Sequence, residues 1–116
     1  MGKKVEYRFR HKKTSDATTP LDILTDAVRV GWKRTIQRVA VEDETLACTE
    51  IRIGYKDQFG EIGWYAEQES PQAGVLYWMK DSVVLEDGDR LLIRFTGTTS
   101  ADVLGVYING FDELVG

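Results

Sequence analysis

The side chains that most often act as nucleophiles or bases are scarce in this sequence. His11 is the only histidine and Cys48 the only cysteine among 116 residues. A nucleophilic mechanism needs a nucleophile held against a base, but His11 lies among Arg10, Lys12 and Lys13, whose charges oppose protonation of its imidazole. One thiol cannot form an internal disulfide, and with one imidazole it cannot complete a zinc site. We predict no catalytic residue of this kind and interpret Cys48 as a small buried thiol.

Carboxylates are more numerous, and two groups of them raise the question of calcium binding or acid–base catalysis. Asp57 and Glu61 flank one glycine turn, and Asp87 and Asp89 flank Gly88. Aspartate beside glycine is also the usual chemistry of a tight turn, because the carboxylate accepts bonds from nearby backbone and glycine adopts a positive φ. Neither group has the spacing of a calcium loop. We predict turns at both places, and no metal site, cofactor or enzymatic activity.

Aromatic side chains are the remaining candidates for a binding surface. Trp64-Tyr65 and Tyr77-Trp78 are adjacent pairs in segments that alternate like strands. Successive side chains of a strand point to opposite faces, so one member of each pair must point away from the face that the other occupies. Tryptophan and tyrosine are enriched as anchors of interfaces, and they also line sugar-binding surfaces. We name Trp64, Tyr65, Tyr77 and Trp78 as candidate partner-binding residues; sheet faces covered by the chain itself are the alternative.

The segments that carry these side chains have the two-residue period of β-strands. Residues 49–66 form two alternating runs around a turn at residues 57–60, which predicts a β-hairpin. In its second strand, Ile62, Trp64 and Ala66 are expected to share one face. The hairpin would therefore hold Trp64 and Tyr65 on opposite sides of one sheet.

An irregularity in residues 32–41 predicts a second local feature. The apolar phase changes there between Ile36 and Val39. One extra residue in a strand moves every following side chain to the other face, so we predict a β-bulge at this point. The remaining runs that we predict as strands are residues 5–10, 21–25, 75–79, 82–85, 90–95 and 103–108. Residues 21–25 are short enough to form a single helical turn after Thr19-Pro20 instead.

These runs predict one all-β domain rather than two. A chain of 116 residues matches the usual size of a single domain. About eight strands separated by turn signals are typical of an antiparallel sandwich. No apolar run approaches the roughly 20 residues of a membrane-spanning helix, so we expect no membrane partner. We predict a jelly-roll-like β-sandwich over residues 21–116, after a basic, extended N-terminal arm and linker over residues 1–20.

Charge is distributed unevenly along the chain. Residues 1–13 hold six of the 15 Lys and Arg residues but only one of the 19 Asp and Glu residues. This segment is predicted either as an edge strand of its own domain or as a strand lent to a neighbouring copy, and a merely solvated strand is the plain alternative. Direct nucleic-acid binding is not expected, because the basic character ends with this segment. The arm residues that we name as partner-binding are Lys3, Lys4, Val5, Tyr7, Arg8, Phe9 and Arg10.

Four segments of strand and turn follow one another through most of the chain. They are Asp-Ile-Leu-Thr at 22–25, Arg-Thr-Ile-Gln-Arg-Val-Ala-Val at 34–41, Ile-Arg-Ile-Gly-Tyr-Lys-Asp-Gln-Phe-Gly at 51–60, and Val-Leu-Glu-Asp-Gly-Asp-Arg-Leu-Leu-Ile at 84–93. This pattern resembles small jelly-roll structural proteins encoded among the virion genes of tailed bacteriophages. The chain departs from that pattern at residues 28–32, where such proteins often carry Pro-Ala-Gly.

The resemblance implies a non-enzymatic structural protein of a virion, assembled in the host cytoplasm. The implied role is a capsid decoration, cement or head–tail neck component that repeats symmetrically on the particle. Its expected partners are other copies of itself, with a trimer favoured, and virion proteins such as the major capsid, portal or neck proteins. The resemblance supplies no catalytic residues. A lectin-like carbohydrate-binding module that uses the exposed aromatic side chains for host attachment is the alternative.

Overall fold

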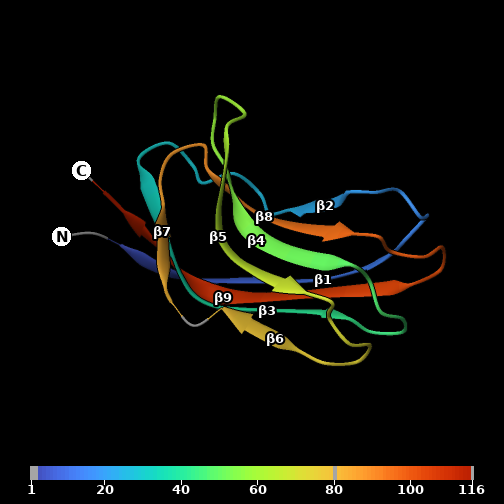
Figure 1. Cartoon of the computed structure of the whole chain (residues 1–116). Coiled ribbons are helices and arrows are strands. Elements are labelled where there is room, and N and C mark those ends of the chain that lie inside the picture. The colour runs from blue at the N-terminus through green and yellow to red at the C-terminus, as the bar shows by residue number, and fades with distance from the viewer. Residues whose placement is uncertain (1–2, 80, 116) are drawn as a thin grey trace.

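Two antiparallel sheets form the molecule, one layered over the other (Figure 1). The computed structural model describes residues 3–79 and 81–115. These residues form nine strands and no helix, so the prediction of an all-β sandwich with about eight strands is confirmed. No helix within the described ranges has the length and apolar character needed to cross a membrane.

The first sheet has five strands and contains both ends of the described chain. Its order is β1, β9, β3 and β6, and β7 pairs with β3 beside β6. The bounds are Lys4–Thr14 for β1, Trp32–Asp43 for β3, Tyr77–Met79 for β6, Val83–Leu85 for β7 and Val103–Leu114 for β9.

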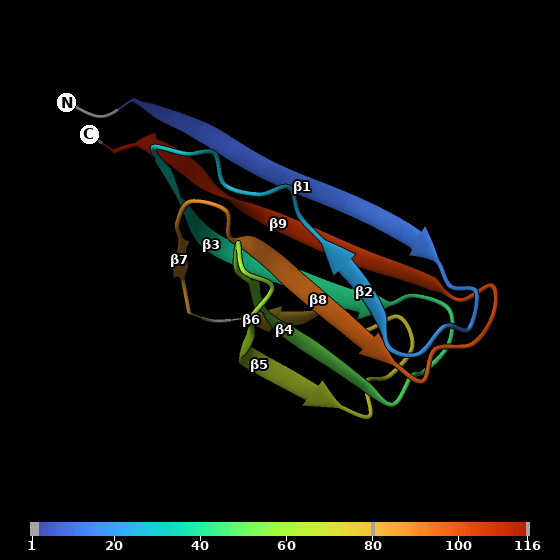
Figure 2. The same ribbon diagram turned by 90° about the horizontal axis from the view of Figure 1, so that it is seen from above.

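The second sheet has four strands in the order β2, β8, β4 and β5. The bounds are Leu21–Leu24 for β2, Glu50–Lys56 for β4, Ile62–Glu69 for β5 and Arg90–Thr96 for β8. The predicted hairpin is confirmed as β4 and β5. Seen from above, β1 and β5 lie at opposite margins of the sandwich, each at the edge of its own sheet (Figure 2).

The core lies between the sheets and is built from alternate residues of the strands. Leu91, Ile93 and Phe95 of β8 are 0% exposed, as a strand with one face on the core requires. They belong to one apolar cluster with residues such as Val106 of β9. Full burial of side chains of this size contributes roughly 1.5–3 kcal/mol each. The core therefore occupies the inner faces, and binding must use the outer faces, edges or loops.

Two bulges adjust which side chains face the core. The bulge predicted in β3 is confirmed by a shift of its register with β9 between Ile36 and Arg38. A second bulge, in β5, was not predicted: Ile53 pairs with Ala66, but the next residue of β4 pairs with Trp64. Trp64 and Ala66 therefore point to opposite faces, and the expectation that they share a face was wrong. The residue between them, Tyr65, is the extra residue of this bulge.

The N-terminal segment forms β1 and pairs with its own chain. All 11 residues of β1 lie opposite residues of β9 in an antiparallel ladder. Of the two alternatives that the sequence left open, the structure has the edge strand, with Tyr7 buried and Phe9 packed against the core. The boundary expected between residues 20 and 21 is therefore corrected, because β1 on one side of it belongs to the same sandwich as the strands on the other side.

A buried polar network joins β1 to the rest of the sandwich. Arg34 of β3 is only 2% exposed, and its Nε donates to Asp112 Oδ1 of β9 at 2.7 Å. The Tyr7 hydroxyl donates to Asp26 Oδ1 at 2.9 Å, and the Arg34 guanidinium lies 3.6 Å from the centre of the Tyr7 ring. Burial raises the pKa of Tyr7 well above its usual range. The network ties three strands and the segment after β2 together.

Candidate interaction surfaces

The Tyr77-Trp78 pair divides between the inside and the outside of the sandwich. Tyr77 packs against the core, and its hydroxyl accepts a hydrogen bond from the backbone N–H of Gln72 at 2.8 Å. Trp78 is 52% exposed. The Arg38 guanidinium lies 5.6 Å from the centre of the Trp78 ring, within cation–π range. Of this pair, only Trp78 is exposed on the outer face.

Trp64 lies on the outer face of the four-stranded sheet and is partly covered there. A Cβ at Gly54 would meet Trp64 Cε3 at 2.7 Å, so the indole lies directly over this glycine. The guanidinium groups of Arg52 and Arg94 lie 5.5 and 5.1 Å from its ring centre. Glycine at this position leaves room for the indole, and the two arginines flank it. Trp64 is therefore a weaker candidate for a free contact than Trp78.

A shallow hollow of about 190 Å³ lies on the outer face of the five-stranded sheet. In the register, Asn109 of β9 is paired with Arg8 of β1 on one side and Arg38 of β3 on the other. Arg8 Nε lies 2.6 Å from a Glu6 carboxylate oxygen. Within residues 3–79 and 81–115, neither Arg10 nor Arg38 forms an ion pair. The hollow is therefore basic, with a lining made of Arg8, Arg10, Arg38, Trp78, Tyr107, Ile108 and Asn109.

Only part of this hollow could be predicted from the sequence. The predicted residues are Arg8 and Arg10 on the N-terminal segment and Trp78 among the aromatic pairs, but not Arg38 or Asn109. The two-residue alternation along a strand does not reveal which distant strand will lie beside Arg38. The order β1, β9, β3 brings these side chains together, and that order depends on pairings between residues far apart in the chain.

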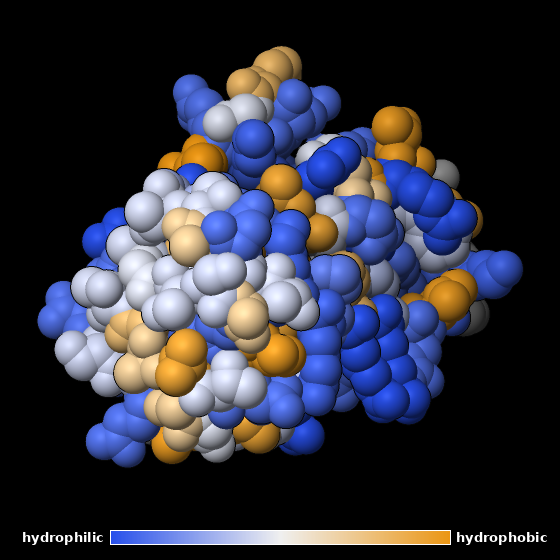
Figure 3. All heavy atoms as spheres, turned by 90° about the vertical axis from the view of Figure 1, so that its right-hand side faces the viewer, coloured by the Kyte–Doolittle hydropathy of each residue, from blue (hydrophilic) through white to orange (hydrophobic). Residues whose placement is uncertain are grey.

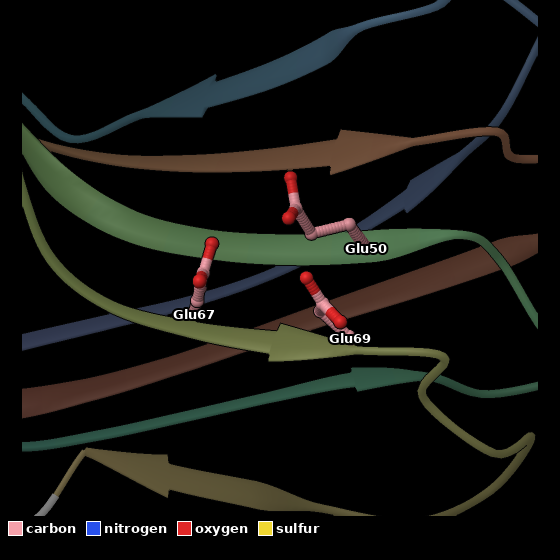
Figure 4. Close-up of side chains that lie close together, drawn as sticks. All are labelled: Glu50, Glu67 and Glu69. Atoms are coloured by element: carbon pink, nitrogen blue, oxygen red, sulfur yellow. The ribbon is translucent and has the colours of Figure 1, made fainter.

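Three glutamates gather at the opposite margin of the molecule (Figure 4). Carboxylate oxygens of Glu50, Glu67 and Glu69 lie within 4.8 Å of one another. Arg52 Nε lies 2.9 Å from Glu50 and 3.3 Å from Glu67, so one guanidinium bridges two carboxylates and offsets one of their two charges. Glu69 has no ion pair in the described part of the chain. The sequence did not predict this cluster, because the hairpin register that sets Glu50 opposite Glu69 was not known.

The edge strand β5 also presents apolar surface. Ile62 and Tyr65 are each 39% exposed. The Tyr65 ring lies 5.5 Å from the ring of Tyr55, and burial raises the pKa of Tyr65 to about 12. The β5 margin therefore combines negative charge with half-exposed apolar side chains, a composition suited to a partner that is basic and partly apolar.

A pair of buried carboxyl groups lies where β3 ends and β9 begins. Asp43 and Asp102 are both 0% exposed, and burial, reinforced by the nearby Asp102, raises the pKa of Asp43 to about 7. The Thr45 hydroxyl donates to Asp102 Oδ1 at 2.5 Å, and the Leu46 N–H donates to the same oxygen at 3.1 Å. Cys48 is 8% exposed, as predicted, and burial raises the pKa of its thiol to about 12. These groups are internal and present nothing to a substrate.

Asp57 and Asp89, one carboxylate of each predicted turn, accept backbone hydrogen bonds within that turn. Asp57 accepts the backbone N–H of Glu61 at 2.9 Å, and Gly60 has a φ of +84°. Asp89 accepts a backbone N–H within its own turn at 2.9 Å, and Gly88 has a φ of +80°. Both predictions of turn chemistry are confirmed, and these carboxylates are occupied by backbone bonds.

One end of the sandwich is poor in charge. Figure 3 faces this end, where the loops after β1, β3, β5 and β8 gather, and pale and orange surface covers much of it. Residues 97–101 read Gly-Thr-Thr-Ser-Ala. Leu46, Val75 and Leu76, in two of the other loops, are 39–44% exposed. The end surface thus differs in character from the two charged margins.

Comparison with known proteins bears on the fold. No family model matches the chain, and no curated protein matches it. A structure of Bacillus endospore appendages, described as a novel family of disulfide-linked pili, matches at 12% identity with a TM-score of 0.56, covering 100% of this chain and 92% of the other. A Gt-strain infectious bursal disease virus structure matches at 9% identity and a TM-score of 0.49, covering 98% of this chain and 32% of the other. The pilus likeness shows a shared jelly-roll-like β-sandwich fold.

Proposed function

We propose that this chain is a non-enzymatic structural subunit that repeats on a larger protein particle and binds its neighbours through sheet margins and outer faces. The observation that carries the proposal is the long edge strand β1, which is basic, exposed along most of its length and opposite an acidic margin at β5. Such a subunit needs complementary surfaces rather than a reaction centre. The resemblance to virion proteins of tailed phages makes a capsid decoration, cement or neck component the specific form of the proposal.

The chemistry of the described residues supports a role without catalysis. The thiol of Cys48 is buried with a pKa raised to about 12, so little of it is the reactive thiolate near neutral pH. The turn carboxylates of Asp57 and Asp89 already accept backbone hydrogen bonds. The proposed partners are other copies of the chain, with a trimer favoured, and capsid, portal or neck proteins of the same virion.

The mass of the purified protein in solution tests this proposal. Light scattering across a concentration series should give a trimer or larger assembly that grows with concentration. A monomer at every concentration would contradict self-assembly. Mixing with purified capsid, portal or neck proteins of a tailed phage would then test the remaining proposed partners.

A carbohydrate-binding module is the second candidate, and Trp78 is the observation that favours it. Its indole is half exposed beside a hollow that also contains arginine and asparagine side chains. On a glycan array, Trp78→Ala should abolish binding without changing the melting temperature. Val84→Ala is the matched control, because Val84 is a 54% exposed apolar residue of β7. Binding that survives Trp78→Ala would reject this candidate.

A further inference from the structure

Two long strands of the described chain have an unpaired outer edge and lie at opposite margins of the molecule. β1 pairs only with β9, and β5 pairs only with β4, among the residues that the structure describes. Figure 2 shows the two strands on opposite sides of the sandwich, both running toward the same end. An unpaired strand edge presents a row of free N–H and C=O groups that another strand can pair with.

The two edges carry opposite charges. The residues of β1 include Lys4, Arg8, Arg10, Lys12 and Lys13 against a single Glu6, whereas β5 contains two glutamates and neither lysine nor arginine. Glu50 of the neighbouring strand adds a third carboxylate to the β5 margin, and Arg52 of that strand, which pairs with Glu50 and Glu67, offsets one of the three charges, so the margin stays net negative. Within the described residues, Arg10 and Glu69 are both exposed and have no ion pair.

Opposite charges select one way of pairing the edges. Charged side chains on edge strands usually hinder edge-to-edge association, and the same sign at both margins would hinder every combination. With one basic and one acidic margin, β1 repels β1 and β5 repels β5, but β1 attracts β5. The charge pattern therefore disfavours a two-fold contact between equal edges and favours a contact between unequal ones.

Both edges also have apolar surface that a contact would bury. Val5 on β1 is 40% exposed, and Ile62 and Tyr65 on β5 are each 39% exposed. Strand pairing supplies the main-chain hydrogen bonds of such a contact, and side-chain burial supplies its hydrophobic part.

We propose that the outer edge of β1 in one copy docks against the outer edge of β5 in the next copy. This inference rests on the proposed function and names the surfaces through which copies meet. Because the two surfaces differ, the contact repeats head to tail and gives a closed ring or an open filament. The two strands run the same way, so copies related by a lateral shift would pair them in parallel.

Charge reversal and its rescue test this contact in the full-length chain. The variants are Arg10→Glu on β1, Glu69→Lys on β5, and both changes together. Arg90→Glu and Glu86→Lys are matched controls, because both residues are exposed and lie on neither β1 nor β5. Association is measured by sedimentation velocity at low and high salt, and circular dichroism confirms that each variant keeps its sheet content and melting temperature.

The wild-type protein should associate, and high salt should weaken its association because exposed charges are screened. Each single reversal on β1 or β5 should weaken association by about tenfold or more, the double variant should regain it, and the controls should match the wild type. Association unaffected by the reversals, or not restored in the double variant, would overturn the edge contact and leave self-assembly standing. A monomer at all concentrations and salts would overturn both.

Discussion

Arg34 shows how a single side chain ties separate strands together. Arg34 is 2% exposed and its guanidinium is held by Asp112, while Asp26 binds both this guanidinium and the Tyr7 hydroxyl. A buried charge is tolerated only with such partners, and the loss of one partner leaves the other uncompensated. The stability of this region therefore depends on the completeness of the network rather than on the number of its charges.

Replacing Arg34 should strongly destabilise the fold. Arg34→Ala is expected to lower the free energy of unfolding by about 3–5 kcal/mol, because the buried Asp112 carboxylate loses its counter-charge. Lys33→Ala is the matched control, since Lys33 pairs with Glu113 at the surface and such pairs contribute under about 1 kcal/mol. Urea unfolding of both variants gives the comparison, and equal losses would refute the role of the network.

The Asp43–Asp102 pair should make stability depend on pH. An unfolded aspartate loses its proton near pH 4, whereas Asp43 in the folded protein keeps it up to about pH 7. The folded state binds more protons between these values, so this contribution is fully present below about pH 4 and is lost as pH rises toward 7.

Asp43→Asn should remove much of this dependence, because the amide does not ionise. The urea midpoint of the wild type is expected to fall between pH 5 and pH 8 more than that of the variant. Glu42→Gln, at the neighbouring position of β3, should show the same fall of the urea midpoint with pH as the wild type. If the urea midpoint of Asp43→Asn fell with pH as much as that of the wild type, groups other than Asp43 would be the cause.

At the scale of elements, β1 is a structural strand whose outer edge we also propose as an interaction surface. Its 11-residue ladder with β9 and the burial of Tyr7 make it part of the sandwich. Its outer edge and its basic side chains remain exposed. These two roles explain why the sequence, which showed alternating apolar and basic residues, was consistent with both an edge strand and a lent strand.

Removal of residues 1–13 should therefore destabilise the domain rather than merely prevent assembly. The deletion would uncover β9 and remove Tyr7 from the Arg34 network. We expect a lower melting temperature and binding of a hydrophobic dye by the truncated chain. A truncated protein that melts as the wild type does would show that β1 is dispensable for the fold and freely available to a neighbour.

A strand feature can be predicted from the sequence only where the local pattern of apolar residues or glycine reveals it. The β3 bulge was predictable because the apolar phase changes visibly between Ile36 and Val39. The β5 bulge was not, because apolar residues on both sides of Tyr65 conceal the change of phase. β9 continues six residues beyond the predicted end at Ile108, although Asn109-Gly110 looks like a turn. A Cβ at Gly110 would clash with the Thr35 carbonyl oxygen, so close strand approach explains this glycine.

At the scale of the whole molecule, opposite charges lie at opposite margins. A basic margin at β1 and an acidic margin at β5 lie on opposite sides of an apolar core, and a charge-poor end lies between them. Composition alone gave a net charge of −4, which hides this separation. The strand order converts an asymmetry along the sequence into one across the molecule, and that asymmetry supports head-to-tail assembly.

Hydrogen exchange measured by mass spectrometry, below and above the concentration at which the protein associates, tests this claim most directly. Backbone amides on unpaired edges exchange quickly in the monomer, and pairing with a neighbouring strand would slow their exchange. We predict that peptides covering β1 and β5 gain protection together on association, while the loops of the charge-poor end do not. Protection confined to those loops, or to only one of the two edges, would contradict it.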